Sequence, residues 1–200
     1  MKTETRTSLQ GWHFLQADKK LAYGDERLVK VGKRMEMSWR DSSGHIRRNP
    51  VRPELCAGGM HACQHLRNVI GYAAGPILCR VTVDTDLDIS SGKFCGRFRT
   101  VEAMVDMTDS LKALIIDCFK YMAKSQNDKT IAAALETTLL TGRAFKVPNK
   151  IKSHRRNLAV EALSRPPHKT IKFLSYNFTK EQLAWFYRRF AHYVKKAGLA

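Results

Sequence analysis

Short apolar runs separated by turn residues dominate the first half of the chain, a pattern typical of β-strands. It predicts a strand that ends near Leu15 and two shorter strands at Leu21–Tyr23 and Leu28–Val31. The clearest predicted strand is Ile77–Val83, because it is rich in β-branched residues and bounded by turn residues. A further short strand is expected at Leu87–Ile89.

Two segments of the first half depart from this pattern. Ser42–Pro53 contains two prolines, a glycine and three arginines, which suits a basic surface loop. His61–Tyr72 is predicted to form a short helix, because Leu66, Val69 and Ile70 would share one of its faces.

Apolar residues recur at helical spacing in the second half of the chain. The spacing predicts a helix over Val101–Lys124, either continuous or broken near Thr108. It predicts further helices at Lys129–Leu140, His154–Leu163 and Lys180–Lys196. The order of elements therefore predicts an α+β protein, with a strand-rich domain at residues 1–100 and a helical, strongly basic region at residues 101–200 packed on it.

Local signals mark the ends of these helices. Asp128 suits the N-cap of the second, and Pro166-Pro167 are expected to end the third because proline cannot continue a helix. Thr179 and Gln182 have the spacing of a capping box ahead of the last helix.

The charge of the chain is far larger than solubility requires. Lys and Arg number 35 against 18 Asp and Glu, a formal charge of +17. From Arg143 to residue 200 there are 14 bases and two acids, a net charge of +12, which leaves 21 bases and 16 acids, or +5, for residues 1–142. This surplus predicts a polyanionic partner, and nucleic acid is the first candidate.

The densest positive cluster and the last helix supply the candidate phosphate contacts. These are Lys150, Lys152, Arg155, Arg156, Arg188, Arg189, Lys195 and Lys196. Such contacts position a protein on nucleic acid without reading its sequence, and their strength falls steeply as salt rises. The alternative is that these side chains form a solvated helix face. Leu183, Phe186, Phe190 and Tyr193 are expected to pack as one apolar stripe.

The cysteines and the hydropathy pattern bear on where the protein acts. Five cysteines form an odd set without the density of a disulfide scaffold, which fits a reducing cytoplasm. No apolar run approaches the length of a membrane span, and no secretory signal precedes Trp12. We therefore expect a cytoplasmic protein without a membrane partner.

One short segment carries residue types that bind zinc. Cys56, His61, Cys63 and His65 lie within ten residues, but they do not form two separated ligand pairs, and a second cluster is lacking. No metal is therefore expected. Neither a GxGxxG motif nor a P-loop motif occurs.

Four short motifs follow one another in an order similar to that of known enzymes. They are WHF (Trp12–Phe14), GMHA (Gly59–Ala62), GYA (Gly71–Ala73) and ILCRV (Ile77–Val81). Over residues 11–103 the chain resembles the ADP-ribosyltransferases of the poly-ADP-ribose polymerase type. The resemblance implies a similar core fold for the N-terminal half, with NAD as the donor of ADP-ribose.

The resemblance also implies roles for individual residues. His13 corresponds to the ribose-binding histidine, His61 takes the place of the first tyrosine of the family, and Tyr72 would stack near nicotinamide. Glu102 is the expected catalytic acid, because a carboxylate can stabilise an oxocarbenium-like transition state and orient the ribose hydroxyl. The alternative is that Glu102 lies in the first turn of the predicted helix, where the helix dipole favours an acid.

The chain is also similar to an uncharacterised bacteriophage and prophage family. WHFL (Trp12–Leu15), GMHAC (Gly59–Cys63) and YAAGPILCRV (Tyr72–Val81) carry this similarity. It implies a phage protein of the bacterial host cytoplasm. The first hypothesis is a nucleic-acid-associated protein that transfers ADP-ribose from NAD to nucleic acid or a host protein. The alternative is a non-enzymatic protein that binds DNA, RNA or a host complex through residues 143–200.

Overall fold

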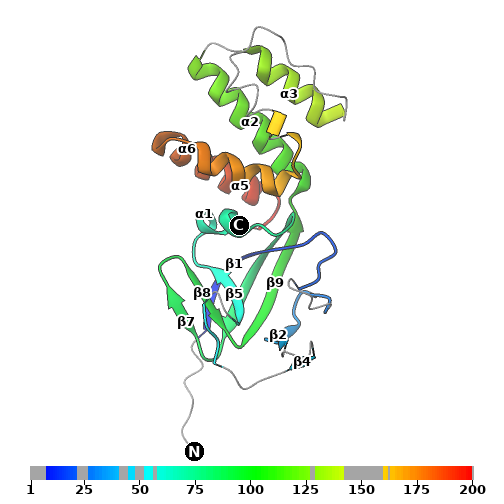
Figure 1. The fold of residues 1–200 in the computed structure, drawn as a ribbon, viewed down its shortest axis with the longest axis vertical. Helices are drawn as coiled ribbons and strands as arrows, with labels where there is room; N and C mark the ends of the chain where they lie inside the picture. Colours follow the sequence, from blue (N-terminus) through cyan, green and yellow to red (C-terminus); the bar gives the residue numbers. More distant parts are fainter. Residues whose placement is uncertain are drawn as a thin grey trace, which may run out of the picture. The chain divides into compact units, whose positions relative to one another are not determined.

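The chain divides into two compact units. A computed structural model describes residues 8–21, 27–40, 45–47, 52–55, 58–126, 129–141, 160–161 and 163–199. One unit ends at Asp106, and the other spans Met107–Gly198. The first contains the strands and the second the long helices (Figure 1). The prediction of an α+β protein is confirmed.

An antiparallel sheet of seven strands forms the described part of the first unit. Its strands are β1 (Ser8–Leu15), β2 (Arg34–Glu36), β5 (Met60–Cys63), β6 (Ile77–Asp84), β7 (Asp88–Ser90), β8 (Lys93–Gly96) and β9 (Phe98–Asp106). Their order across the sheet is β2-β9-β6-β1-β5-β8-β7. A separate two-stranded ladder joins β3 (Trp39–Arg40) and β4 (Ile46–Arg47), so that β4 lies within the segment predicted as a loop.

The strand β6 lies at the centre of this sheet, and the sequence predicted it. β1 pairs with β6 along its whole length, from Ser8 opposite Asp84 to Leu15 opposite Ile77. β9 pairs along the other side. A strand enclosed in this way tolerates apolar residues at most positions, and six of the eight residues of β6 are buried.

The strand β9 carries one extra residue opposite β6. Ala103 pairs with Arg80 and Val101 pairs with Val81, which leaves Glu102 without a partner in the ladder. This irregularity is a β-bulge, a feature that re-aims a side chain. The helix predicted from Val101 is therefore wrong for residues 101–106, and Glu102 does not lie in a helical turn. Apolar residues spaced by three and four also fit a bulged strand over so short a stretch.

The sheet curves strongly around its core. The Arg99 Nη1 atom on β9 donates a hydrogen bond of 3.0 Å to the carbonyl oxygen of His61 on β5, although β6 and β1 separate these strands. Three strand spacings of about 4.8 Å exceed the reach of one side chain, so the sheet must curl. Gly11 fits the same crowded interior, because a Cβ there would lie 2.6 Å from the Cys63 carbonyl oxygen and 2.8 Å from the Phe94 ring.

The segment predicted as a helix at His61–Tyr72 has a different structure. His61 belongs to strand β5, and the helix α1 covers only Leu66–Val69, followed by a 3₁₀ turn at Ile70–Tyr72. The prediction was wrong at its start because MHAC pairs with β8 residue by residue, a long-range contact that the local pattern does not reveal.

The other short predicted strands have mixed outcomes. Leu28 and Val31 form only isolated bridges, with Lys20 and Val101, and Leu21–Tyr23 lies partly outside the described residues. The strand expected at Leu87–Ile89 is present as β7, shifted by one residue.

Four helices are described in full in the second unit. They are α2 (Thr108–Gln126), α3 (Lys129–Thr141), α5 (Pro167–Asn177) and α6 (Lys180–Lys196). α2 packs against the other three. Its buried residues recur at helical spacing, which explains why this part of the predicted helix is confirmed. They are Leu111, Leu114, Ile115, Ile116, Cys118, Phe119 and Ala123.

Two prolines begin a helix that the sequence analysis did not predict. Pro166 is the N-cap of α5 and Pro167 is its first residue. Proline is well suited to that position, because the amide hydrogen it lacks would have no partner in the first turn. The helix predicted at His154–Leu163 and the Asp128 cap lie largely outside the described residues.

The last helix agrees with its prediction. Thr179 caps α6, its side chain accepts a hydrogen bond from the Gln182 amide, and the Gln182 side chain accepts one from the Thr179 amide. Phe186, Phe190 and Tyr193 are buried, which confirms most of the predicted apolar stripe.

Candidate functional site

His13 lies on the core side of the sheet. It is directly opposite Cys79, which belongs to the apolar core, and opposed residues share a face of a sheet. Burial lowers the pKa of His13 well below its usual value, and the positive charge of Arg99 adds to this effect. His13 is therefore a neutral imidazole at neutral pH.

His61 and Tyr72 are both close to Lys93. Ala62 belongs to the apolar core, so the neighbouring His61 points to the other side of β5. Burial lowers the pKa of His61, Lys93 adds to this effect, and Asp88 opposes it. The Lys93 Nζ atom lies 5.6 Å from the centre of the Tyr72 ring, which is 57% exposed. These two predicted residues thus have a common neighbour.

Glu102 lies on the face of the sheet opposite His13. Its carboxylate accepts hydrogen bonds from the Thr82 hydroxyl and, at 3.4 Å, from the Gln10 amide. Thr82 and Gln10 oppose each other in the ladder and point away from the core residues Val81 and Val83. The structure therefore does not bring Glu102 and His13 together.

The charges of the helical unit follow a simple pattern. Four of its described acids are ion-paired: Asp109 with Lys112 at 3.4 Å, Asp117 with Arg189 at 2.6 Å, Glu136 with Lys120 at 2.7 Å, and Glu161 with Arg165. The fifth, Glu181, lies in the first turn of α6 and accepts a hydrogen bond of 3.0 Å from the Thr179 hydroxyl. The described carboxylates of this unit are thus engaged within it.

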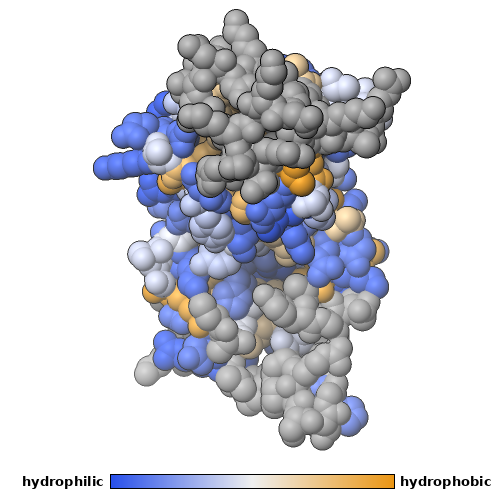
Figure 2. Space-filling model, turned by 45° about the horizontal axis from the view of Figure 1, so that its top comes forward, coloured by the Kyte–Doolittle hydropathy of each residue, from blue (hydrophilic) through white to orange (hydrophobic). Residues whose placement is uncertain are grey.

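Among the bases of this unit whose side chains the structure describes, six have no ion pair with a described residue, and all six lie on α5 or α6. They are Lys169, Lys172, Lys180, Arg188, Lys195 and Lys196. Lys172 is half-buried and the other five are exposed. Hydrophilic residues cover much of the described surface visible in Figure 2. The unpaired bases therefore give α5 and α6 a surplus of positive charge.

The predicted phosphate contacts divide into three groups. Arg188, Lys195 and Lys196 are exposed and unpaired, as a phosphate contact requires. Arg189 instead pairs with Asp117. Lys150, Lys152, Arg155 and Arg156 lie outside the described residues. Lys169, Lys172 and Lys180 were not among the predicted contacts, although the spacing of Ile171 and Leu174 offered a helical signal for α5.

Asp117 on α2 accepts hydrogen bonds from two side chains of α6. Its Oδ2 atom accepts hydrogen bonds from Arg189 Nε at 2.6 Å and from the Tyr193 hydroxyl at 2.7 Å. Burial raises the pKa of Tyr193 to about 12, and the Asp117 carboxylate adds to the rise. The network joins α2 to α6, so Arg189 has a structural partner that the free bases lack.

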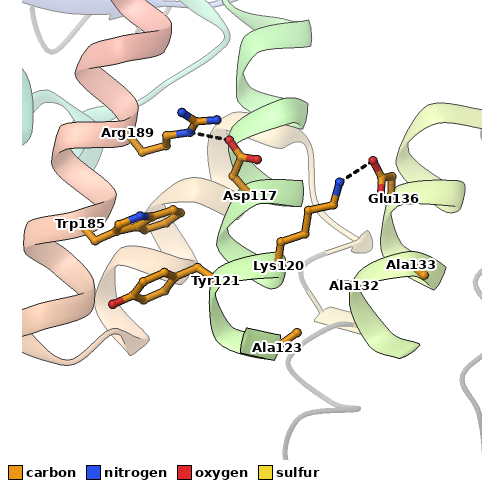
Figure 3. Close-up of a pocket in the computed structure, with 9 residues that line it drawn as sticks. All are labelled: Asp117, Lys120, Tyr121, Ala123, Ala132, Ala133, Glu136, Trp185 and Arg189. Carbon is orange, nitrogen blue, oxygen red and sulfur yellow. Dashed lines mark hydrogen bonds and ion pairs between the residues drawn. The ribbon is translucent and has the colours of Figure 1, made fainter. Parts of the chain in front are cut away.

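A groove of about 500 Å³ lies beside this network (Figure 3). The stacked rings of Tyr121 and Trp185, with centres 4.3 Å apart, line it together with small alanines. Its charged groups form the Asp117–Arg189 and Lys120–Glu136 pairs and therefore cancel. The groove has no surplus charge with which to hold an anion.

Comparison with known proteins does not assign a function to this chain. No family model, curated protein or solved structure matches the chain. Among the described residues, no three His, Cys, Asp or Glu side chains gather as metal ligands would, and Cys56 of the zinc alternative is not described. No described helix is long and apolar enough to span a bilayer.

Proposed function

We propose that the protein binds nucleic acid through its helical unit. The pairing of charges carries the proposal: the described acids of this unit are engaged within it, whereas six bases of α5 and α6 are unpaired. An exposed, unpaired base can neutralise a phosphate without first giving up an internal ion pair. Each such contact releases a counterion from the nucleic acid, which favours binding.

The test removes three of these bases and compares a charge-matched control. The variant combines Arg188→Gln, Lys195→Gln and Lys196→Gln. The control combines Lys30→Gln, Lys33→Gln and Lys112→Gln, which remove the same charge elsewhere on the chain. Binding of a labelled oligonucleotide is measured by fluorescence anisotropy between about 50 and 200 mM salt.

The expected result depends on position, not only on net charge. The α6 variant should bind about tenfold or more weakly, with a shallower dependence of log K on log salt. The control should stay within about twofold of the unchanged protein. Equal losses in the two variants, or binding that does not respond to salt, would overturn the proposal.

Transfer of ADP-ribose from NAD is the second candidate function. It is supported by the positions of His61, Lys93 and the exposed ring of Tyr72, which together suit an anionic nucleotide with a planar base. In this version Asp88 takes the role first given to Glu102. Asp88 on β7 and His61 on β5 pair with the same residue of β8, Cys95, from opposite sides.

Nicotinamide release from NAD tests this second function directly. Under it, His61→Ala and Asp88→Asn should each abolish release, whereas Glu102→Gln should not. The absence of nicotinamide release from the unchanged protein would remove this candidate function. A phage origin stays a proposal that rests on short sequence motifs.

A further inference from the structure

An exposed tyrosine lies on the basic face of α5. Tyr176 is 71% exposed and makes no hydrogen bond or ring contact with another described residue. The opposite face of this helix is buried through Thr170, Ile171 and Leu174. Lys172 precedes Tyr176 by four residues, so the two side chains are neighbours on the solvent face.

A second lysine extends the same face. Lys169 precedes Lys172 by three residues, which places both on the side of the helix that carries Tyr176. Neither lysine is paired with a described carboxylate, whereas Arg165, at the start of this region, is held by Glu161 and lies 4.8 Å from the centre of the Phe173 ring. The two unpaired lysines of α5 thus lie on the N-terminal side of the exposed Tyr176 ring, on the same face of the helix.

We propose that Tyr176, with Lys169 and Lys172, is a stacking site for single-stranded nucleic acid. The proposal rests on the proposed function and specifies the form of the nucleic acid. A tyrosine ring can stack against any unpaired base, while the lysines beside it contact the phosphates that run along one side of the ring. In a duplex the bases are stacked on one another, so the ring would find no free base face.

The cost of leaving Tyr176 exposed favours this interpretation over a role in folding. A buried tyrosine contributes apolar contact and a hydrogen bond, and Tyr193 has both in this unit. Tyr176 has neither with the described residues. Its replacement should therefore alter binding and leave the stability of the helical unit unchanged.

The experiment compares three polyanions of similar length. They are an oligothymidylate of about 15 nucleotides, a duplex of the same length and inorganic polyphosphate, which carries charge without bases. Affinities of the full chain are measured for the unchanged protein, for Tyr176→Ala, for Tyr176→Phe and for Leu140→Ala, which removes an equally exposed apolar side chain from α3.

Loss of one stacked base predicts a selective effect. Tyr176→Ala should weaken binding of the oligothymidylate about 5- to 100-fold, whereas Tyr176→Phe and Leu140→Ala should stay within about twofold. Duplex and polyphosphate binding should not change. Lys172→Gln should weaken all three interactions and reduce their salt dependence.

Two other results would be decisive in different ways. If Tyr176→Ala has no effect, or weakens all three interactions equally, the stacking site is wrong while binding through the basic helices stands. If none of the three polyanions binds, the proposed function fails and the stacking site fails with it. Circular dichroism of each variant checks that the helices are intact.

Discussion

The two units use their charged residues in different ways. In the sheet unit, Arg34 is paired with Asp84, Arg97 is paired with Asp86 at 2.8 Å, and Arg99 is enclosed with 4% exposure. The exposed bases Lys30, Lys33 and Arg67 of this unit have no ion pair among the described residues. In the helical unit the described acids are engaged within the unit, and the unpaired bases whose side chains are described lie on two helices. The net charge of a unit therefore does not locate an interface by itself. Only the bases that are exposed and have no internal ion pair are candidates for contacts with a partner.

The largest effect of a single substitution is expected in the core of the sheet unit. Phe94 is fully buried and lies against Gly11. Phe94→Ala removes this contact and leaves a cavity, which should lower the free energy of unfolding by about 3–5 kcal/mol in a urea titration. The control is Ile89→Ala, which changes the residue of β7 that pairs with Phe94. Ile89 is 54% exposed, so this substitution should lower the free energy of unfolding by less than about 1 kcal/mol. Similar losses of stability in Phe94→Ala and Ile89→Ala would contradict the inference that the buried core stabilises this unit.

A smaller loss of stability is expected from Asp117→Ala in the helical unit. The substitution leaves the buried Tyr193 hydroxyl and Arg189 without their shared acceptor. It should lower the free energy of unfolding by about 1–3 kcal/mol. Binding of nucleic acid should persist or become tighter, because Arg189 is released.

The control is Asp109→Ala, which breaks a solvent-exposed ion pair. No measurable loss in the free energy of unfolding is expected for it. Weaker binding by Asp117→Ala would show that this acid contributes to the interface.

The same network predicts how stability depends on alkaline pH. Burial, with a further contribution from Asp117, raises the pKa of Tyr193 from 10.0 to about 12. The unfolded chain therefore loses the phenolic proton at lower pH than the folded chain does. The stabilisation is complete below pH 10 and decreases as the pH rises from 10 to 12. Tyr193→Phe should remove this part of the slope in urea titrations across that range, and an unchanged slope would contradict the network.

Local patterns predicted the elements whose period and ends are both marked in the sequence. β6 is a long run of β-branched and apolar residues, and α6 has a capping box and an apolar stripe. The junction of β9 and α2 was not predictable, because the apolar spacing from Val101 to Leu111 continues without a break through a bulged strand into a helix. Pro167 was predicted to end a helix, but it is the first residue of α5, since proline is common both after the end of a helix and in its first turn.

The candidate interface was predictable only in part. The charge of the chain indicated Arg188, Lys195 and Lys196, which are exposed and have no ion pair among the described residues. The sequence gives no sign that Arg189 is unavailable, because its partner Asp117 is 72 residues away. Tyr176 and its lysines were missed because α5 itself was not predicted. The opposed faces of His13 and Glu102 depend on strand register, which short motifs do not specify.

The smallest effect among these predictions concerns the start of α6, where structure and recognition can be separated. Thr179→Ala removes a side-chain acceptor for the Gln182 amide and should lower the free energy of unfolding by about 1 kcal/mol. Trp185 lies in the second turn of α6, so its fluorescence during urea unfolding reports on this helix. Thr179→Ser keeps the hydroxyl and should preserve stability. The bases of α6 remain in place in both variants, so affinity for nucleic acid should stay within about twofold. A large loss of affinity in Thr179→Ala alone would mean that binding depends on the exact start of α6 as well as on its unpaired bases.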